Sequence, residues 1–351
     1  MKLFIAKHSP LFLLAALCIL LAVASEDFRR FGNLKSVAGR TSEIGVISAG
    51  ELLVILTGGI DLSVGSVAAL GGVVSCQCIK VLQQWQLTYL EGTFAEALLG
   101  VESGWLPVIA GTLIGALVGL GCGLMNGLII TKGRVPPFIV TLGTMMWARG
   151  LALICSGGNQ IFGMPPAFPW LGGTKQIYVT SLETGESNQL SAWWVPVLLM
   201  LLITLGLSLM LNFARLGRAI YATGGSLQAA RLSGLSVDRV RITVYGLSGL
   251  LAGFAGVILA SRTSVAAPTG AEMYELEAVA ACVIGGASLM GGEGGAFAAL
   301  AGALIMVVLR NYCNLENINV YWQQVFVGGL IVILVFYDNY RKRKAGLLKD
   351  A

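Results

Sequence analysis

Residues 57–72 read TGGIDLSVGSVAALGG and lie between two apolar stretches. Glycine pairs weaken a helix, and a carboxylate such as Asp61 is costly near the centre of a bilayer unless it faces a polar cavity or a partner. Irregular backbone at that depth is tolerated only where protein buries it or where it lines a wet path. The stretch therefore predicts a helix that is broken inside a membrane.

The same pattern occurs a second time, towards the end of the chain. The spacing GGxxLxxG at 58–65 recurs at 285–292, and AALxG at 68–72 recurs at 298–302. Apolar segments interrupted by glycine in two parts of a membrane protein point to a transport path. The alternative is that small residues merely allow helices to pack closely. With 47 glycines in the chain, some matches are also expected by chance.

The composition restricts the class of protein. Of the 351 residues, 56% are hydrophobic and 12% are charged, whereas soluble chains carry about 25% charged residues. These values predict an all-α, polytopic membrane protein. The net charge of +5 lies mainly in the loops, so nucleic acid is not an expected partner. A single histidine excludes a histidine-based catalytic triad, and the seven cysteines fall mostly in apolar runs, so no metal site is expected.

Hydropathy predicts about ten transmembrane helices in one transmembrane domain over residues 1–351, with short or broken helices at the two glycine-rich breaks. The first apolar run also fits a signal peptide with an A-x-A site. We favour an uncleaved span, because it keeps both chain ends on one side. Residues 25–42 are expected to form a short interfacial helix, and residues 80–105 and 156–192 are expected to be loops on the outer side. The predicted spans are 11–24, 43–57, 62–79, 106–130, 138–155, 193–213, 242–260, 276–284, 296–309 and 325–337.

Charge sets the expected orientation. With ten spans, the side that holds both termini also holds most of the basic residues, including those of the 213–241 loop and the terminal run 341–344. By the positive-inside rule this side is the cytoplasm. Four basic residues fall on the opposite side and weaken the assignment locally: Arg29, Arg30, Lys35 and Arg40.

The 213–241 loop is expected to contain a short helix. Ser226 is a good N-cap for residues 227–232, and Gly234 is a good helix stop. The plain interpretation is a solvated inside loop that is rich in arginine because inside loops are.

Four stretches, at 57–70, 125–153, 216–258 and 274–295, are similar in sequence and order to the permease subunits of ribose-type ABC importers. This family lies within the superfamily of monosaccharide and branched-chain amino acid permeases. The resemblance implies that the short helix docks on a separate ATPase subunit. Family members usually have Gly-Gly-Asn followed by an acidic residue, whereas this chain has GSLQ at 225–228. The residues implied in ATPase coupling are Gly225, Ser226, Gln228, Ala229, Ala230, Arg231 and Gly234.

The resemblance also implies partners. These are two ATPase domains that bind ATP and Mg²⁺, an external sugar-binding protein and a second permease copy in the bacterial inner membrane. The chain itself contains no Gly-Lys dipeptide, so it lacks a phosphate loop of the GxxxxGK type. We therefore expect no catalytic residue in this chain.

Polar residues at the breaks and on neighbouring spans are candidates to line a sugar path. A sugar needs hydrogen-bond partners but no charge. Serine and threonine often bond to their own helix instead, and Asp61 fits a cap for the following helix equally well. Arg310 is expected to extend outward towards the membrane surface. The candidate path residues are Asp61, Ser63, Ser66, Asn126, Thr141, Thr144, Glu275, Glu277 and Ser288.

The resulting hypothesis is a permease subunit that imports a monosaccharide such as a ribose-like pentose. A branched-chain amino acid permease is the alternative within the superfamily. An ion-coupled secondary transporter and a membrane-embedded enzyme are weaker alternatives from other classes. The second permease copy is expected to be either the same chain or a sister subunit.

Overall fold

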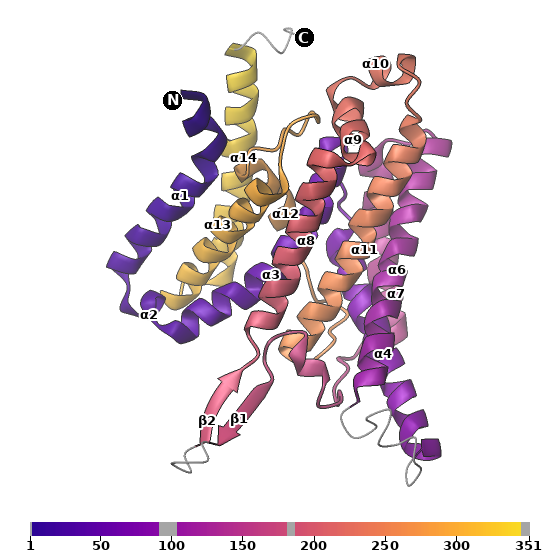
Figure 1. Ribbon diagram of the computed structural model, residues 1–351, viewed down its shortest axis with the longest axis vertical. Coiled ribbons are helices and arrows are strands. Elements are labelled where there is room, and N and C mark those ends of the chain that lie inside the picture. Colours follow the sequence, from indigo (N-terminus) through magenta and orange to yellow (C-terminus); the bar gives the residue numbers. More distant parts are fainter. Residues whose placement is uncertain (1, 91–103, 181–186, 345–351) are drawn as a thin grey trace.

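The computed structural model describes residues 2–90, 104–180 and 187–344. Long helices run side by side through most of the molecule, and an antiparallel hairpin projects from one end (Figure 1). The elements in chain order are α1 Lys2–Ala24, α2 Glu26–Arg29, α3 Phe31–Leu56, α4 Val64–Leu90, α6 Trp105–Lys132, α7 Pro137–Ser156, η1 Phe168–Trp170, β1 Gln176–Thr180, β2 Ser187–Ser191, α8 Trp194–Phe213, α9 Arg215–Gly225, α10 Leu227–Leu232, α11 Val237–Thr263, α12 Tyr274–Ile284, α13 Ala296–Leu315 and α14 Val320–Lys344.

The two ends of the bundle differ. Figure 1 places the first turns of α1, the last turns of α14 and the short helices α9 and α10 at one end, opposite the β1–β2 hairpin. We call these the α10 end and the hairpin end. This is the arrangement expected if both chain ends share a side with the 213–241 loop.

Six of the described helices are long and apolar enough to cross a membrane: α4, α6, α7, α8, α11 and α13. The prediction of a helical, multi-pass membrane protein is therefore confirmed. The number of about ten spans stays a prediction, because several other helices do not meet these criteria. For example, α12 has only 11 residues.

Two predicted segment boundaries differ from the structure. Residues 25–42 do not form a separate interfacial helix, because only α2 is separate and α3 is continuous from Phe31 to Leu56. Likewise α4 extends to Leu90, well into the predicted 80–105 loop. Residues 80–90 contain neither glycine nor proline, so their polar character marks a change of surroundings rather than a helix end. The rest of that loop, 91–103, lies outside the described residues.

The predicted 156–192 loop contains regular structure. β1 and β2 form an antiparallel pair in which Gln176 lies opposite Ser191 and Thr180 lies opposite Ser187. A separate bridge joins Ile161 to the segment after α11. The described residues are thus helical apart from this hairpin and the isolated bridge, and the all-α class stands.

Glycine brings the backbones of α4, α6 and α11 into contact. A Cβ atom built on Gly115 of α6 would lie 2.7 Å from the Gly71 carbonyl oxygen of α4, and one on Gly119 would lie 2.9 Å from the Gly253 Cα atom of α11. Such distances leave no room for a methyl group, so the glycines at 111, 115 and 119, which are spaced by four in the sequence, form a tight packing face. Close approach through small residues is how helices associate in lipid.

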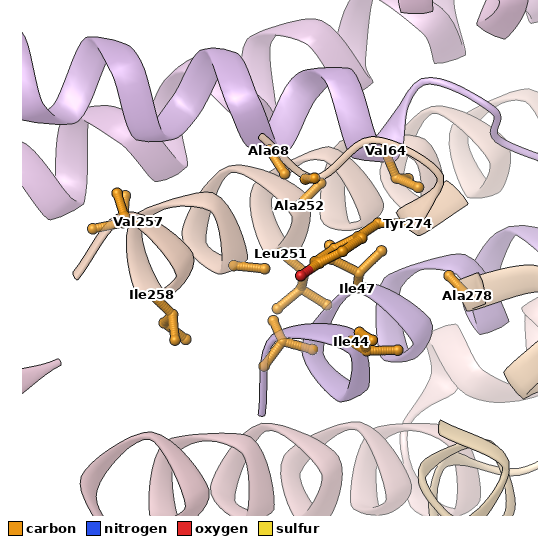
Figure 2. Close-up of a cluster of buried hydrophobic side chains, with 14 of the residues drawn as sticks. Ile44, Ile47, Val64, Ala68, Leu251, Ala252, Val257, Ile258, Tyr274 and Ala278 are labelled. Atoms are coloured by element: carbon orange, nitrogen blue, oxygen red, sulfur yellow. The ribbon is translucent and has the colours of Figure 1, made fainter. Parts of the chain in front are cut away.

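A second group of buried side chains joins α3, α4, α11 and α12. Figure 2 shows the Tyr274 ring of α12 among aliphatic side chains that include Ile47 of α3, Ala68 of α4 and Leu251 of α11. All four side chains are less than a tenth exposed. This core fixes α12, and with it the start of the second glycine-rich break, against the main bundle.

Buried ion pairs also connect the helices. Arg262 of α11 pairs with Glu43 of α3, which also accepts a 3.2 Å hydrogen bond from the Tyr274 hydroxyl. Arg310 of α13 pairs with Glu277 of α12. Arg310 therefore does not extend outward as predicted, because a buried carboxylate on the neighbouring helix holds it.

The glycine packing can be tested with two substitutions on one helix. Gly119→Ala places a methyl group against the α11 backbone, whereas Gly121→Ala adds the same group where no atom lies within 4 Å. We expect Gly119→Ala to destabilise the protein by about 1–3 kcal/mol through overpacking. Gly121→Ala should be neutral or stabilising, because alanine is the better helix former. Thermal unfolding of the purified proteins in detergent measures both, and equal melting temperatures would contradict the packing assignment.

Candidate functional site

The first break, residues 57–63, begins with a glycine cap. Gly58 has a positive φ of 76°, and its N–H donates to the Ile55 carbonyl at 2.9 Å, while the Gly59 N–H donates to the Val54 carbonyl at 3.2 Å. This pair of bonds is the usual way in which glycine ends an α-helix. It explains why α3 stops where the sequence predicts a break.

The second break, residues 285–295, begins in the same way. Gly286 has a φ of 85°, its N–H donates to the Val283 carbonyl, and the Ala287 N–H donates to the Cys282 carbonyl, both at 2.9 Å. The helix end at Gly58 thus corresponds to Gly286, one residue away from the GGxxLxxG match in the sequence. The two breaks share a common glycine cap geometry, and the matching glycines are one position out of register with the sequence repeat, which stays a prediction.

The two breaks also contact each other. The Gly292 N–H donates a 3.0 Å hydrogen bond to the carbonyl of Leu56, the last residue of α3. A Cβ atom on Gly58 would lie 3.4 Å from the Met290 carbonyl oxygen. Segments more than 200 positions apart in the chain therefore form one structural unit, which we call the break junction, comprising residues 56–59 and 290–294.

A buried hydrogen-bonded network starts in the first break. Glu51 Oε1 accepts the Asp61 backbone N–H at 3.0 Å. Asp61 Oδ1 accepts the backbone N–H of Ser63 at 2.9 Å and its hydroxyl at 2.6 Å. Because α4 begins at Val64, Asp61 satisfies a free donor just ahead of that helix. Asp61 therefore shapes the turn that leads into α4, although it accepts no N–H from α4 itself.

The network continues into α6 and α7. Asn126 Nδ2 donates to the Ser63 hydroxyl oxygen at 3.0 Å, and the Thr144 hydroxyl donates to Asn126 Oδ1 at 2.6 Å. The Thr141 hydroxyl, one turn before Thr144, is shared between the Phe138 carbonyl of its own helix at 3.3 Å and the Ile60 carbonyl at 3.4 Å. We call Glu51, Asp61, Ser63, Asn126 and Thr144 the Asp61 network. Four of the nine candidate path residues belong to this network, and a fifth, Thr141, lies beside it.

The side of this network nearest α11 has unused hydrogen-bonding capacity. Glu51 Oε2 and the Tyr245 hydroxyl are both buried and have no hydrogen-bond partner in the described part of the chain. The Tyr245 hydroxyl lies against the first break, because a Cβ atom on Gly59 would collide with it. The candidate list omitted these two residues. Glu51 could have been found from the sequence, because it is an acidic residue within an apolar run. No sequence pattern marks Tyr245 as a residue of the site.

The remaining candidates lie elsewhere. Ser66 is buried on α4, and Glu277 is held in its ion pair with Arg310. Ser288 accepts the Met290 N–H at 3.2 Å and so shapes the second break. The Glu275 carboxylate lies against Gly65 in the first turn of α4, where a helix N-terminus favours negative charge. These four positions are therefore not part of the Asp61 network.

A cavity of about 320 Å³ lies between α4, α11 and residues 263–274. Arg149 fixes this last segment, since its Nη1 donates at 2.8 Å to the carbonyls of both Pro268 and Gly270. The lining is mostly alanine and glycine, and Gln160, Thr263 and Tyr274 are its side chains with polar atoms. Among the residues described, no group of three or more His, Cys, Asp or Glu is placed to hold a metal ion.

α10 has the caps expected from the sequence. The Ser226 hydroxyl accepts the Ala229 N–H at 3.2 Å, and Gly234 follows with a φ of 78°. Gly225, expected in this helix, is instead the last residue of α9.

The exposed face of α10 differs from the prediction at two positions. Ala230 is buried against the chain itself, so it is not available as a docking residue, whereas Gln228, Ala229 and Arg231 are exposed. Leu232 was not predicted, yet the residue is 84% exposed. Leu232 could have been found from the sequence, because it is an apolar residue at the end of a short helix flanked by polar residues.

Comparisons with known proteins agree with this arrangement. A family model described as "Branched-chain amino acid transport system / permease component" matches residues 33–335. The ribose import permease protein RbsC of Escherichia coli K12 is 35% identical over 97% of this chain and 96% of its own length. RbsC of Bacillus subtilis 168 is 36% identical over 97% and 94%.

A further relative, the xylose transport system permease protein XylH of E. coli K12, is 30% identical over 89% of this chain and 86% of its own length. No solved structure matches the chain significantly. A family model that spans most of the chain and relatives that match it almost from end to end show that this chain belongs to the branched-chain amino acid transport system permease family.

Proposed function

We propose that this chain is the membrane-spanning permease subunit of an ABC importer that carries a monosaccharide, such as ribose or a related pentose, across the bacterial inner membrane. The observation that carries this proposal is the identity of 35–36% to two ribose import permeases over 97% of the chain. The xylose relative transports a sugar of the same size class according to its name.

ATP hydrolysis is assigned to a separate subunit that binds ATP and Mg²⁺, because the chain contains no GxxxxGK loop. The exposed residues of α10 form the proposed docking surface for that subunit. The further proposed partners are an external sugar-binding protein and a second permease, either the same chain or a sister subunit.

The proposed topology has about ten spans, with both termini and the α10 end in the cytoplasm. Its support is the concentration of arginine in the 213–241 loop, since basic residues favour the cytoplasmic side. The hairpin end would then face the periplasm, where a binding protein delivers substrate.

The Asp61 network is proposed to face the sugar path at one step of transport. Its groups are hydroxyl, amide and carboxylate, which are the partners that sugar hydroxyls use. The unpartnered Glu51 Oε2 and Tyr245 hydroxyl supply further capacity. Asp61 thereby has two proposed roles, as a cap for α4 and as a path residue.

A branched-chain amino acid is the second candidate substrate, because it appears in the description of the matching family. An amino acid carries two charges that a sugar lacks. No salt bridge among the described residues involves Glu51 or Asp61, and the network holds no cation for a substrate carboxylate. This favours the neutral substrate.

Uptake into proteoliposomes tests the proposal directly. The permease is reconstituted with its ATPase subunit and its binding protein, and radiolabelled D-ribose, D-xylose and L-leucine are compared. We expect uptake of a pentose that requires ATP and all three components. Uptake of leucine would support the second candidate, and sugar uptake driven by an ion gradient without the ATPase would contradict an ABC importer.

The docking surface is tested with a charge placed on α10. Leu232→Asp and Ala229→Glu should weaken co-purification of the ATPase subunit about 30-fold or more, because they put a carboxylate into the centre of an interface. Asn159→Glu places a carboxylate on an exposed residue at the hairpin end and should leave co-purification unchanged. Normal ATPase binding by both α10 variants would exclude this surface.

The Asp61 network is tested with two substitutions at one position. Asp61→Ala leaves the Ser63 N–H and hydroxyl without their acceptor, and each unpaired buried group costs about 1–3 kcal/mol. We expect a lower melting temperature and impaired pentose uptake. Asp61→Asn keeps an acceptor and should retain the stability but not the full uptake. If Asp61→Asn transports like the wild type, Asp61 acts as a cap alone.

A further inference from the structure

α9 lies directly against the break junction. The Tyr221 hydroxyl donates a 2.7 Å hydrogen bond to the Gly294 carbonyl in the second break. Gly224, one turn later, packs on the Leu56 carbonyl at the end of α3, and a Cβ atom there would also collide with the Gly292 backbone. One short helix therefore touches both breaks at the point where they contact each other.

The rest of α9 is firmly held. Ile220 and Thr223, on the same side of the helix, are at most 2% exposed. Burial raises the pKa of Tyr221 above its ordinary value, so its hydroxyl keeps the proton that it donates. By contrast, Ala222 and Gly225 on the opposite side are exposed.

α9 is also joined tightly to α10. Only Ser226 separates the two helices, and its hydroxyl caps α10 through the Ala229 N–H. Figure 1 shows α10 at the tip of the bundle with α9 directly beneath it. A displacement of α10 should therefore move α9, because a connection of one extended residue is too short to absorb the movement.

We infer that α9 is the relay between the docking helix and the two breaks, with Tyr221 and Gly224 as positioning residues that transmit a movement of α10 to the ends of α3 and α12. This inference rests on the proposed function and adds to it the residues that connect ATP hydrolysis to the transport path. Because α9 contacts α10 at one end and the break junction at the other, a movement at the junction also reaches α10. Delivery of sugar at the hairpin end should stimulate the ATPase through the same contacts.

Two substitutions on α9 separate transport from hydrolysis. Tyr221→Phe removes one hydroxyl, and Gly224→Ala inserts a methyl group between α9 and Leu56. Matched controls are Tyr321→Phe, at an exposed tyrosine of α14, and Gly206→Ala on α8, where no atom lies within 4 Å. The complete importer is assayed in proteoliposomes for radiolabelled D-ribose and D-xylose uptake and for ATP hydrolysis in the same vesicles.

We expect both α9 variants to retain the ATPase subunit and its hydrolysis, while the number of sugar molecules imported per ATP falls about 3- to 30-fold. Stimulation of hydrolysis by the sugar-loaded binding protein should fall in parallel, and the controls should match the wild type. A merely structural defect would lower uptake and hydrolysis together and leave their ratio unchanged.

Three results would overturn the relay: an unchanged ratio in Tyr221→Phe, an unchanged ratio in Gly224→Ala, or loss of the ATPase subunit from both variants. Tyr221→Phe decides the question if Gly224→Ala does not fold, since it adds no atom. Failure of the proposed function has a different signature, because the wild-type importer would then take up neither sugar with ATP.

Discussion

Helix ends inside a bundle must find partners for their free backbone groups, and this requirement organises the centre of the molecule. The last carbonyl of α3, on Leu56, receives the Gly292 N–H from the other break. Ahead of α4, the Ser63 N–H donates to Asp61. Each break thus depends on groups outside its own helix, so neither can change shape without affecting the other or the Asp61 network.

The buried charges fall into two kinds that suit different purposes. Glu43 and Glu277 are each paired with an arginine on another helix, and removing one partner of such a pair is strongly destabilising. Glu51 and Asp61 have backbone and hydroxyl partners instead. The first kind holds helices together in one arrangement. The second kind can exchange partners with water or a polar substrate at lower cost.

The sequence was sufficient for the helical class, the positions of both breaks and the glycine packing face, since each depends on local backbone chemistry or on a four-residue spacing. It could not show that Ser63, Asn126 and Thr144 join in one network, because that depends on how α4, α6 and α7 pack. The end of α4 was misplaced because hydropathy reports the surroundings of a helix and not where it stops. Tyr245 and Leu232 were not predicted, because no local sequence pattern shows whether a single side chain is buried or exposed.

Glycine has two different roles in this chain, close helix packing and helix termination, and the two roles are found in different parts of the molecule. Along α4, α6 and α11 it removes side chains so that backbones interlock, which makes that part of the bundle hard to deform. At the break junction it supplies positive φ angles and lets α9 approach through Gly224. A movement that enters at α10 therefore meets a stiff three-helix unit on one side and a junction of caps and single hydrogen bonds on the other. In the proposed relay the junction is therefore the part that yields, and it lies at the end of α3, the helix that carries Glu51 of the Asp61 network.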